Sequence, residues 1–419
     1  MERNEKNHVF FIYLYLCPIF DAITGVAVEH GLIAADSLGS PSQLWRIVGL
    51  LYFVSKLKFN RIGPQLFLLS TFYVAFVEFF AFFAYSHDLK AFLFGISYGL
   101  KPAYLIAIYS YLSSEIDKGL LESSALLKAL LRMTTIYGFA VCFAFVTHTG
   151  LNSYSGAGFG TKGYFASNNA LSLLLGVGTL LALIALPKKK FPWGIVVLLL
   201  NLFGCILIGA KTSILFLAIS IVVLFVRSSF GTKIVLIVLI AVAIAVLWVP
   251  ISSFLDRIFS VVLLHFGKVK SGSDFLQFVA SSRNLFVEDA FRHFSLNGIL
   301  FPRLFFGAGV TTSFRDPFDL SINYIYKYGF FTMLETDAGD IFFYYGLFGF
   351  LSYCFLFFFA SFYVIINKNY GIFWVFVAIF FFSFVAGHVT FDGMAGLLIP
   401  TVLLLVKTYK GDPRVGTAA

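Results

Sequence analysis

The feature that most constrains how this chain can fold is its series of long apolar runs. A helix needs about 20 mostly apolar residues to cross the hydrocarbon core of a bilayer. Runs of suitable length occur near residues 9–28, 41–56, 66–86, 89–113, 130–148, 169–186, 194–209, 212–227, 234–255, 338–365, 371–388 and 394–407. The pattern predicts an all-α polytopic membrane protein, with residues 1–419 forming one integral membrane domain of about twelve transmembrane helices.

Composition excludes a soluble protein of several domains. Hydrophobic residues make up 59% of the chain, charged residues only 12%, and the mean hydropathy is +0.90, whereas a soluble domain has about 25% charged residues. The net charge of +9 is therefore interpreted as membrane topology, and no nucleic-acid partner is predicted. Histidines and cysteines lack metal-ligand spacing and no Walker A sequence occurs, so we predict neither a metal site nor a cofactor.

Basic residues predict the orientation of the helices. If the N-terminus faces the cytoplasm, more than half of the 30 lysines and arginines lie on that side, as the positive-inside rule requires. Both termini are then cytoplasmic. The long connection 256–335 lies outside, and a loop of this length is translocated largely regardless of its charges. Its many Phe, Leu and Tyr residues predict a folded, partly helical loop on the outer membrane surface.

An ionisable residue inside a predicted span is a candidate functional residue by default, because a charge in hydrocarbon is costly. Glu78 lies in the third span and Lys101 in the fourth. They could form an internal ion pair that fixes the packing of adjacent helices, or they could contact a substrate. Asp21 and Arg46 lie nearer the outer face and could belong to either class.

The long outer loop carries a candidate anion site. Arg283 falls in the first turn of a predicted amphipathic helix that continues over 284–294. A cation there opposes the helix dipole, and the arrangement makes sense if an anion docks on the free N–H groups. The alternative is a surface arginine that pairs with a neighbouring carboxylate. Arg292 and Arg303 are weaker versions of the same feature.

Two further candidate sites are a cluster of acidic residues and a single lysine. Glu335, Asp337 and Asp340 occur together where the chain re-enters the membrane. A carboxylate that is partly shielded from water at the end of a membrane span can act as a general base. Alternatively, Asp337 could be the N-cap of the span that follows it. Lys211 lies at the outer tip of the tight hairpin between the seventh and eighth spans. It could bind phosphate or be a helix-end lysine that reaches toward the interface.

Several of these pieces together resemble the superfamily of bacterial O-antigen polymerases (Wzy-type) and O-antigen ligases (WaaL-type), which are polytopic membrane glycosyltransferases. The pieces that carry the resemblance are GYFASNN at 163–169, GAKTS at 209–213, SSR at 281–283, FGAG at 306–309, ETDAGD at 335–340 and YGLFG at 345–349. Each is short, and their order along the chain, with one large outer loop, makes the similarity more specific.

The resemblance implies metal-independent, inverting glycosyl transfer on the periplasmic face of the bacterial inner membrane. Undecaprenyl-diphosphate-linked oligosaccharide would be the substrate, embedded in membrane lipid, and a polysaccharide chain-length regulator is an expected partner. Arg283 would bind the diphosphate, helped by Lys211, Arg303 and Arg292. Glu335 or Asp337 would act on the acceptor hydroxyl as a base or as a positioning carboxylate.

Within this superfamily the sequence favours a polymerase of O-antigen or a related surface polysaccharide. Ligases typically place a histidine at the start of the span after the large loop, and here that position reads Glu335-Thr336-Asp337. One alternative is a ligase that transfers the glycan to lipid A-core. Another is a flippase or transporter of lipid-linked oligosaccharide, for which Lys101 and Glu78 inside the membrane are the best evidence.

Overall fold

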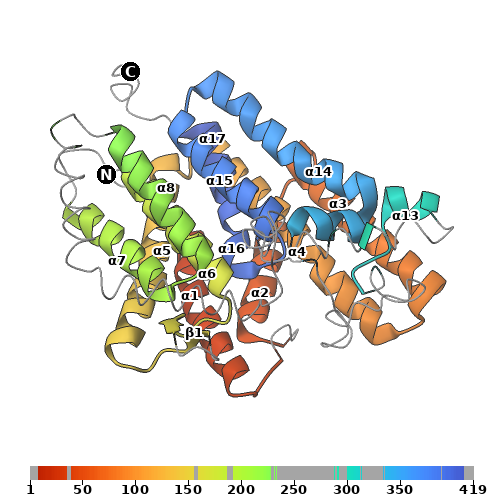
Figure 1. The fold of residues 1–419 in the computed structure, drawn as a ribbon. Coiled ribbons are helices and arrows are strands. Elements are labelled where there is room, and N and C mark those ends of the chain that lie inside the picture. Colours follow the sequence, from red (N-terminus) through yellow and green to blue (C-terminus); the bar gives the residue numbers. More distant parts are fainter. Residues whose placement is uncertain are drawn as a thin grey trace, which may run out of the picture. The chain divides into compact units, whose positions relative to one another are not determined.

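The computed structural model describes residues 8–34, 39–154, 159–185, 192–227, 300–311, 336–387 and 389–409, together with 231, 233, 287, 290, 291, 313 and 334. Its helices are α1 (His8–Glu29), α2 (Pro41–Ser55), α3 (Ile62–Ala81), α4 (Leu89–Asp117), α5 (Ser123–Val146), α6 (Asn168–Ala185), α7 (Pro192–Ile208), α8 (Lys211–Arg227), α13 (Leu300–Phe306), α14 (Asp337–Asn367), α15 (Tyr370–Ala386), α16 (Gly393–Gly396) and α17 (Leu398–Thr408) (Figure 1). A π-helical turn, η2 (Phe82–Ser86), continues α3. A small antiparallel hairpin pairs β1 (Asn152–Tyr154) with β2 (Phe159–Thr161).

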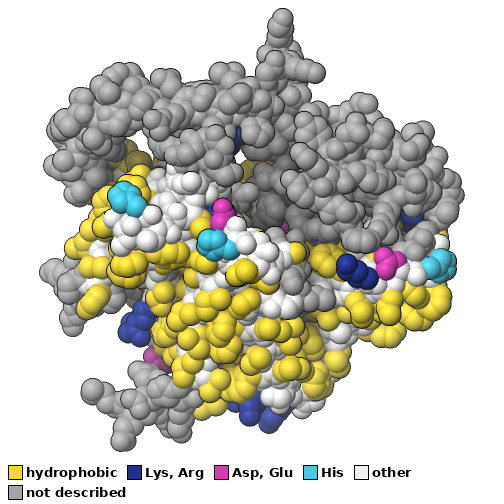
Figure 2. Space-filling view, turned by 90° about the horizontal axis from the view of Figure 1, so that it is seen from below, with side chains coloured by type: hydrophobic (Ala, Val, Ile, Leu, Met, Phe, Trp, Pro, Cys, Tyr) yellow, Lys and Arg dark blue, Asp and Glu magenta, His cyan; other side chains and the backbone are white. Residues whose placement is uncertain are grey.

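The protein is an all-α membrane protein, as predicted. Among the described residues, five helices are long and apolar enough to cross a bilayer, namely Val9–Glu29, Ile62–Ala84, Leu89–Asp117, Ser123–Val146 and Asp337–Asn367. Large apolar side chains such as Phe72 and Phe358 point outward, 71% and 66% exposed, and hydrophobic side chains cover wide areas of the described surface in Figure 2. Such a surface suits contact with lipid tails.

Each predicted span that the structure describes coincides with a helix, and the span predicted at 234–255 lies outside the described residues. The apolar helices over Asn168–Ile184, Trp193–Ile208, Lys211–Val226, Tyr370–Val385 and Gly393–Thr408 are shorter than the five above. The number of crossings and the cytoplasmic placement of both termini therefore stay predictions.

Helix ends follow local chemistry. Pro41 begins α2, and the Ser40 side chain accepts a hydrogen bond from the Gln43 N–H, which satisfies one of the free amides of the first turn. Asp88 does the same for α4 by accepting from the N–H of Lys90. The tight hairpin predicted between α7 and α8 is present, because α7 ends at Ile208 and α8 begins at Lys211.

The chain divides into two compact units, and each is described by itself. The first comprises Met1–Met133 and Ala280–Ala419, and the second comprises Thr134–Val279. In the first unit α3 packs along α4, and α14 packs against α13, α15 and α17 (Figure 1). This unit holds the described residues discussed below, apart from Lys211.

The second unit is organised around α6. Residues 170–182 of this helix are all buried, and α7 and α8 pack against it. Polar contacts join the helices, since the Ser213 hydroxyl donates to Ser172 Oγ at 2.7 Å and Asn201 Nδ2 donates to Thr134 Oγ1 at 3.2 Å. In lipid, such hydrogen bonds add to close packing as a means of holding helices together.

Candidate functional site: a helix break bridged by a loop segment

Helix α14 is interrupted at Gly346. This residue has φ 61° and ψ −163°, a non-helical conformation inside the helix that essentially only glycine adopts without strain. A Cβ at Gly346 would also overlap the backbone of Phe305. The sequence predicted one continuous span over 338–365, so the break is a feature that the apolar pattern did not reveal.

The segment that follows α13 bonds to the backbone just before this break. The Ala308 N–H donates to the Phe343 carbonyl at 3.2 Å, and the Gly309 N–H donates to the Tyr344 carbonyl at 3.0 Å. A helix that ends leaves its last carbonyls without partners, and in the membrane interior each unpaired group costs several kcal/mol. The FGAG segment supplies those partners.

Glycine is required on the loop side as well. Gly307 has φ 78°, and a Cβ there would overlap the carbonyl of Tyr344. The backbone of the loop therefore lies directly against the backbone of α14. Because the FGAG and YGLFG segments each provide a glycine for this approach, the two motifs form a single substructure.

Helix α3 holds this substructure from the other side through two residues. The Tyr73 hydroxyl donates to the Tyr345 carbonyl at 2.7 Å and to the Phe305 carbonyl at 3.4 Å. Glu78, whose side chain is 1% exposed, accepts from the Val310 N–H at 2.8 Å and from the Tyr345 hydroxyl at 3.4 Å.

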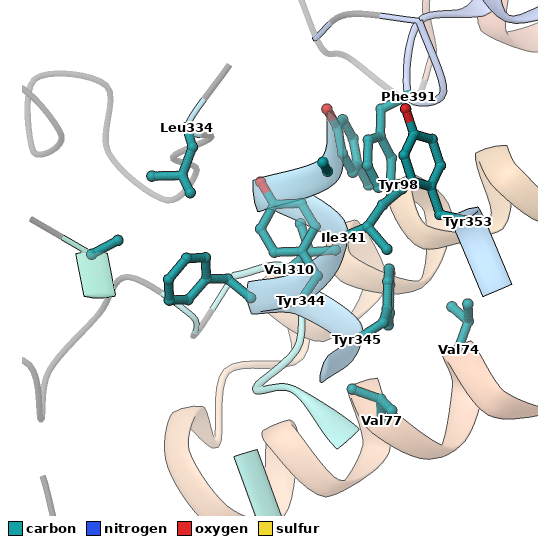
Figure 3. Close-up of a cluster of buried hydrophobic side chains, with 13 residues drawn as sticks. Val74, Val77, Tyr98, Val310, Leu334, Ile341, Tyr344, Tyr345, Tyr353 and Phe391 are labelled. Carbon is teal, nitrogen blue, oxygen red and sulfur yellow. The ribbon is translucent and has the colours of Figure 1, made fainter. Parts of the chain in front are cut away.

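The surrounding side chains make a buried aromatic and aliphatic cluster. Val74 and Val77 of α3, Val310 of the loop and Tyr345 of α14 converge in Figure 3. The ring of Tyr98 in α4 stacks on that of Phe391 at 4.9 Å between centroids. The break is thus enclosed in apolar packing, and its polar groups bond to one another.

Of the two alternatives for Lys101 and Glu78, an ion pair or substrate contact, the ion pair is not formed. The ammonium nitrogen of Lys101 lies 4.0 Å from the centroid of the Tyr98 ring, on the same helix, a cation–π contact. The carboxylate of Glu78 bonds to Val310 and Tyr345 instead. Glu78 therefore joins α3 to the rest of the unit through hydrogen bonds, and Lys101 is not its counter-ion.

The acidic residues at the start of α14 are buried and bonded within the protein. Asp337, 1% exposed, accepts at Oδ2 from the Ser383 hydroxyl at 2.6 Å and from the N–H groups of Val389 and Thr390 at 3.1 and 2.7 Å. It ties the start of α14 to α15, through Ser383, and to the chain that follows α15. The prediction that Asp337 caps the span is wrong, because Thr336 is the N-cap of α14 and the donors to Asp337 lie outside this helix. Asp337 is instead an acceptor that joins α14 to other parts of the unit.

Asp340 has a comparable role one turn further along. Its side chain is 2% exposed, and Oδ1 accepts from the Leu334 N–H at 2.6 Å. A side-chain hydrogen bond also joins it to Tyr344. Glu335, the third member of the acidic cluster, lies outside the described residues.

The predicted basic residues are only partly described. Arg303 belongs to α13 and is 3% exposed, and its carbonyl accepts from the Gly307 N–H at 2.8 Å. It therefore directly precedes the segment that bridges the break. Lys211 is the first residue of α8, in the second unit. Arg283 and Arg292 lie outside the described residues.

Asp21 and Arg46 form a buried ion pair. Arg46 Nη2 donates to the two carboxylate oxygens of Asp21 at 2.7 and 3.0 Å, and the two side chains are 14% and 5% exposed, respectively. Both charges are satisfied by a short contact between α1 and α2. Their geometry assigns them to helix packing.

Sequence reasoning missed Tyr73, Tyr345 and the amide of Val310 as parts of the site. The Glu78–Val310 and Tyr73–Tyr345 bonds join residues 232 and 272 positions apart, and periodicity cannot reveal such pairs. Comparisons with family models, curated proteins and solved structures find no match to this chain. Function is therefore argued from the residues and their geometry.

Proposed function

We propose that the protein polymerises O-antigen or a related surface polysaccharide at the periplasmic face of the bacterial inner membrane. In the proposed reaction a hydroxyl oxygen of one repeat unit bonds to the anomeric carbon of another, with inversion. The bond from that carbon to the diphosphate oxygen breaks, and undecaprenyl diphosphate leaves. The hydroxyl proton passes to a carboxylate base.

One observation carries the proposal. Two motifs of the O-antigen polymerase resemblance, FGAG at 306–309 and YGLFG at 345–349, lie directly against each other. The amides of Ala308 and Gly309 bond to the carbonyls of Phe343 and Tyr344, just before YGLFG, and a Cβ at Gly346 would overlap the Gly307 nitrogen. Arg303, in the helix that precedes FGAG, is buried, and so are Asp337 and Asp340 at the start of α14. A fixed cation in a site of low polarity stabilises the charge that develops on a diphosphate leaving group. Motifs that meet in this way support a shared role.

The roles of individual residues follow from the resemblance and from the hydrogen bonds described above. We propose Arg283 as the main diphosphate-binding residue, helped by Arg303, Arg292 and Lys211. Asp337 Oδ2 already accepts three hydrogen bonds from within the protein, which gives Asp337 a structural role. Glu335 is therefore the stronger candidate for the base.

The test uses purified protein in detergent. The substrate is undecaprenyl-diphosphate-linked repeat units extracted from cells in which the gene is deleted, with neither nucleotide nor metal added. A ladder of longer lipid-linked glycans on a gel is expected, and Arg283→Ala should abolish it. Arg61→Ala is the matched control, because Arg61 pairs with Asp117 at an exposed position and should leave the ladder intact.

A transporter of lipid-linked oligosaccharide is the second candidate, and the break in α14 favours it. Interrupted helices with bonded, non-helical backbone inside the membrane are common in transporters. The break lies well inside the span, because Gly346 is about 14 Å along α14 from its first residue, Asp337, at 1.5 Å per residue. Movement of the same substrate across a proteoliposome membrane, without any ladder, would replace the polymerase proposal with this one.

The ligase alternative has its own signature in the same assay. Added lipid A-core would become glycosylated, and lipid-linked chains would not lengthen. The polymerase proposal expects lengthening without lipid A-core.

A further inference from the structure

Glu78 is the only acidic side chain in the span Ile62–Ala84, and the elements around it leave space for it. A Cβ at Gly95 of α4 would overlap the Glu78 carboxylate, and a Cβ at Gly99 would overlap the Tyr345 hydroxyl. From the loop side, a Cβ at Gly309 would lie 3.0 Å from Glu78 Oε2. The site is therefore shaped around the contact between Glu78 and Tyr345.

The donors that reach Glu78 come from two elements that must stay together. One is the Val310 N–H of the loop, and the other is the Tyr345 hydroxyl, one residue before the break in α14. Tyr73 makes a second attachment from the same helix, to the carbonyls of Tyr345 and Phe305. Helix α3 thus holds the loop segment at both of its ends, at Phe305 and at Val310.

The arrangement does not require a negative charge. Both groups that contact Glu78 Oε1 are donors, an amide N–H and a hydroxyl, and the amide oxygen of glutamine can accept from both. A role in ion or proton coupling, in contrast, needs a carboxylate that can bind and release a cation. Glutamine and alanine substitutions therefore separate a positioning role from a coupling role.

We propose that Glu78 is a positioning residue, which fixes the 305–310 segment of the loop against the break in α14 and so sets the position of Arg303. This inference rests on the proposed polymerase function only for its kinetic consequence. The attachment of the loop can be measured without any activity. Positioning matters for the reaction because a displacement of about 1 Å can cost on the order of 100-fold in rate.

The kinetic arm measures initial rates of chain lengthening with the extracted lipid-linked repeat units. Glu78→Ala is expected to lower kcat/KM on the order of 100-fold, and Glu78→Gln is expected to recover most of that loss. Glu115→Ala is the control, because it removes another carboxylate of a membrane helix, one that pairs with Lys118. It should stay close to the wild type.

The structural arm measures hydrogen exchange of peptides covering 300–311. Glu78→Ala should accelerate exchange there and leave α6 unchanged, and Glu78→Gln should match the wild type. If Glu78→Ala does not fold, Tyr345→Phe removes one of the two donors and should show the same effects more weakly.

Two results would overturn the inference. One is a glutamine variant as inactive as the alanine variant, which would assign a role to the charge itself. The other is unchanged exchange over 300–311 in Glu78→Ala. If the wild type makes no ladder, the polymerase proposal fails by itself, and the exchange measurement still decides whether Glu78 holds the loop.

Discussion

Gly346→Ala is expected to destabilise the protein by about 2–6 kcal/mol, from backbone strain and overlap together. At φ 61° and ψ −163° a non-glycine residue bears a strain of about 1–3 kcal/mol. The new Cβ would also overlap the Phe305 backbone, and forcing an extra methyl group into a packed site costs about 1–3 kcal/mol. Backbone atoms cannot rotate away as a side chain can, so the overlap persists.

Gly119→Ala separates the two contributions. Gly119 has φ 68°, and a Cβ there meets nothing within 4 Å, so only left-handed strain of about 1–2 kcal/mol is expected. Both variants would be unfolded in mixed detergent micelles and followed by tryptophan fluorescence. A loss for Gly346→Ala no greater than that for Gly119→Ala would refute the close approach of the loop to the break.

Two further substitutions test the buried charges, using the same unfolding measurement. Arg46→Ala leaves Asp21 buried without its cation and should lower the free energy of unfolding by about 3–5 kcal/mol. Arg61→Ala, in a pair about half exposed, should lower it by under about 1 kcal/mol. Equal losses in the two variants would contradict this. Asp337→Ala leaves the Ser383 hydroxyl and two backbone amides without this acceptor, and each unsatisfied donor should cost about 1–3 kcal/mol of stability. Asp337→Asn keeps one acceptor oxygen and should lose clearly less; the reverse order would argue against the structural role.

Helices were predictable because each membrane span must satisfy its own backbone hydrogen bonds and bury or present an apolar surface. The predicted run 338–365 matches α14 at Asp337–Asn367. The predicted tight hairpin is also present, with its turn at Gly209 and Ala210, because α8 begins at Lys211. These elements depend on local sequence, so local patterns suffice to find them.

The break in α14 was not predictable in the same way. Gly346 and Gly349 occur in one apolar run, and only Gly346 departs from the helix. What distinguishes it is the loop backbone lying against it, which arrives from about 40 residues earlier in the chain. A local pattern holds no information on that approach, although the YGLFG motif marks the place.

The candidate site shows the same limit. Glu78 was predicted as a functional or packing residue because a carboxylate in hydrocarbon needs a partner, and it has partners. Lys101 was the expected one, since the two lie on neighbouring helices. The actual partners are a loop amide and a tyrosine hydroxyl, which are invisible to a search for opposite charges.

The most direct test of the polymerase proposal compares the number of glycosidic bonds formed with the amount of undecaprenyl diphosphate released. Purified protein would be incubated with the extracted undecaprenyl-diphosphate-linked repeat units, and both the liberated undecaprenyl diphosphate and the glycosidic bonds formed would be quantified. The account predicts one diphosphate released for each bond, with chains that lengthen over time. Release of diphosphate without chain growth, or no release at all, would contradict it.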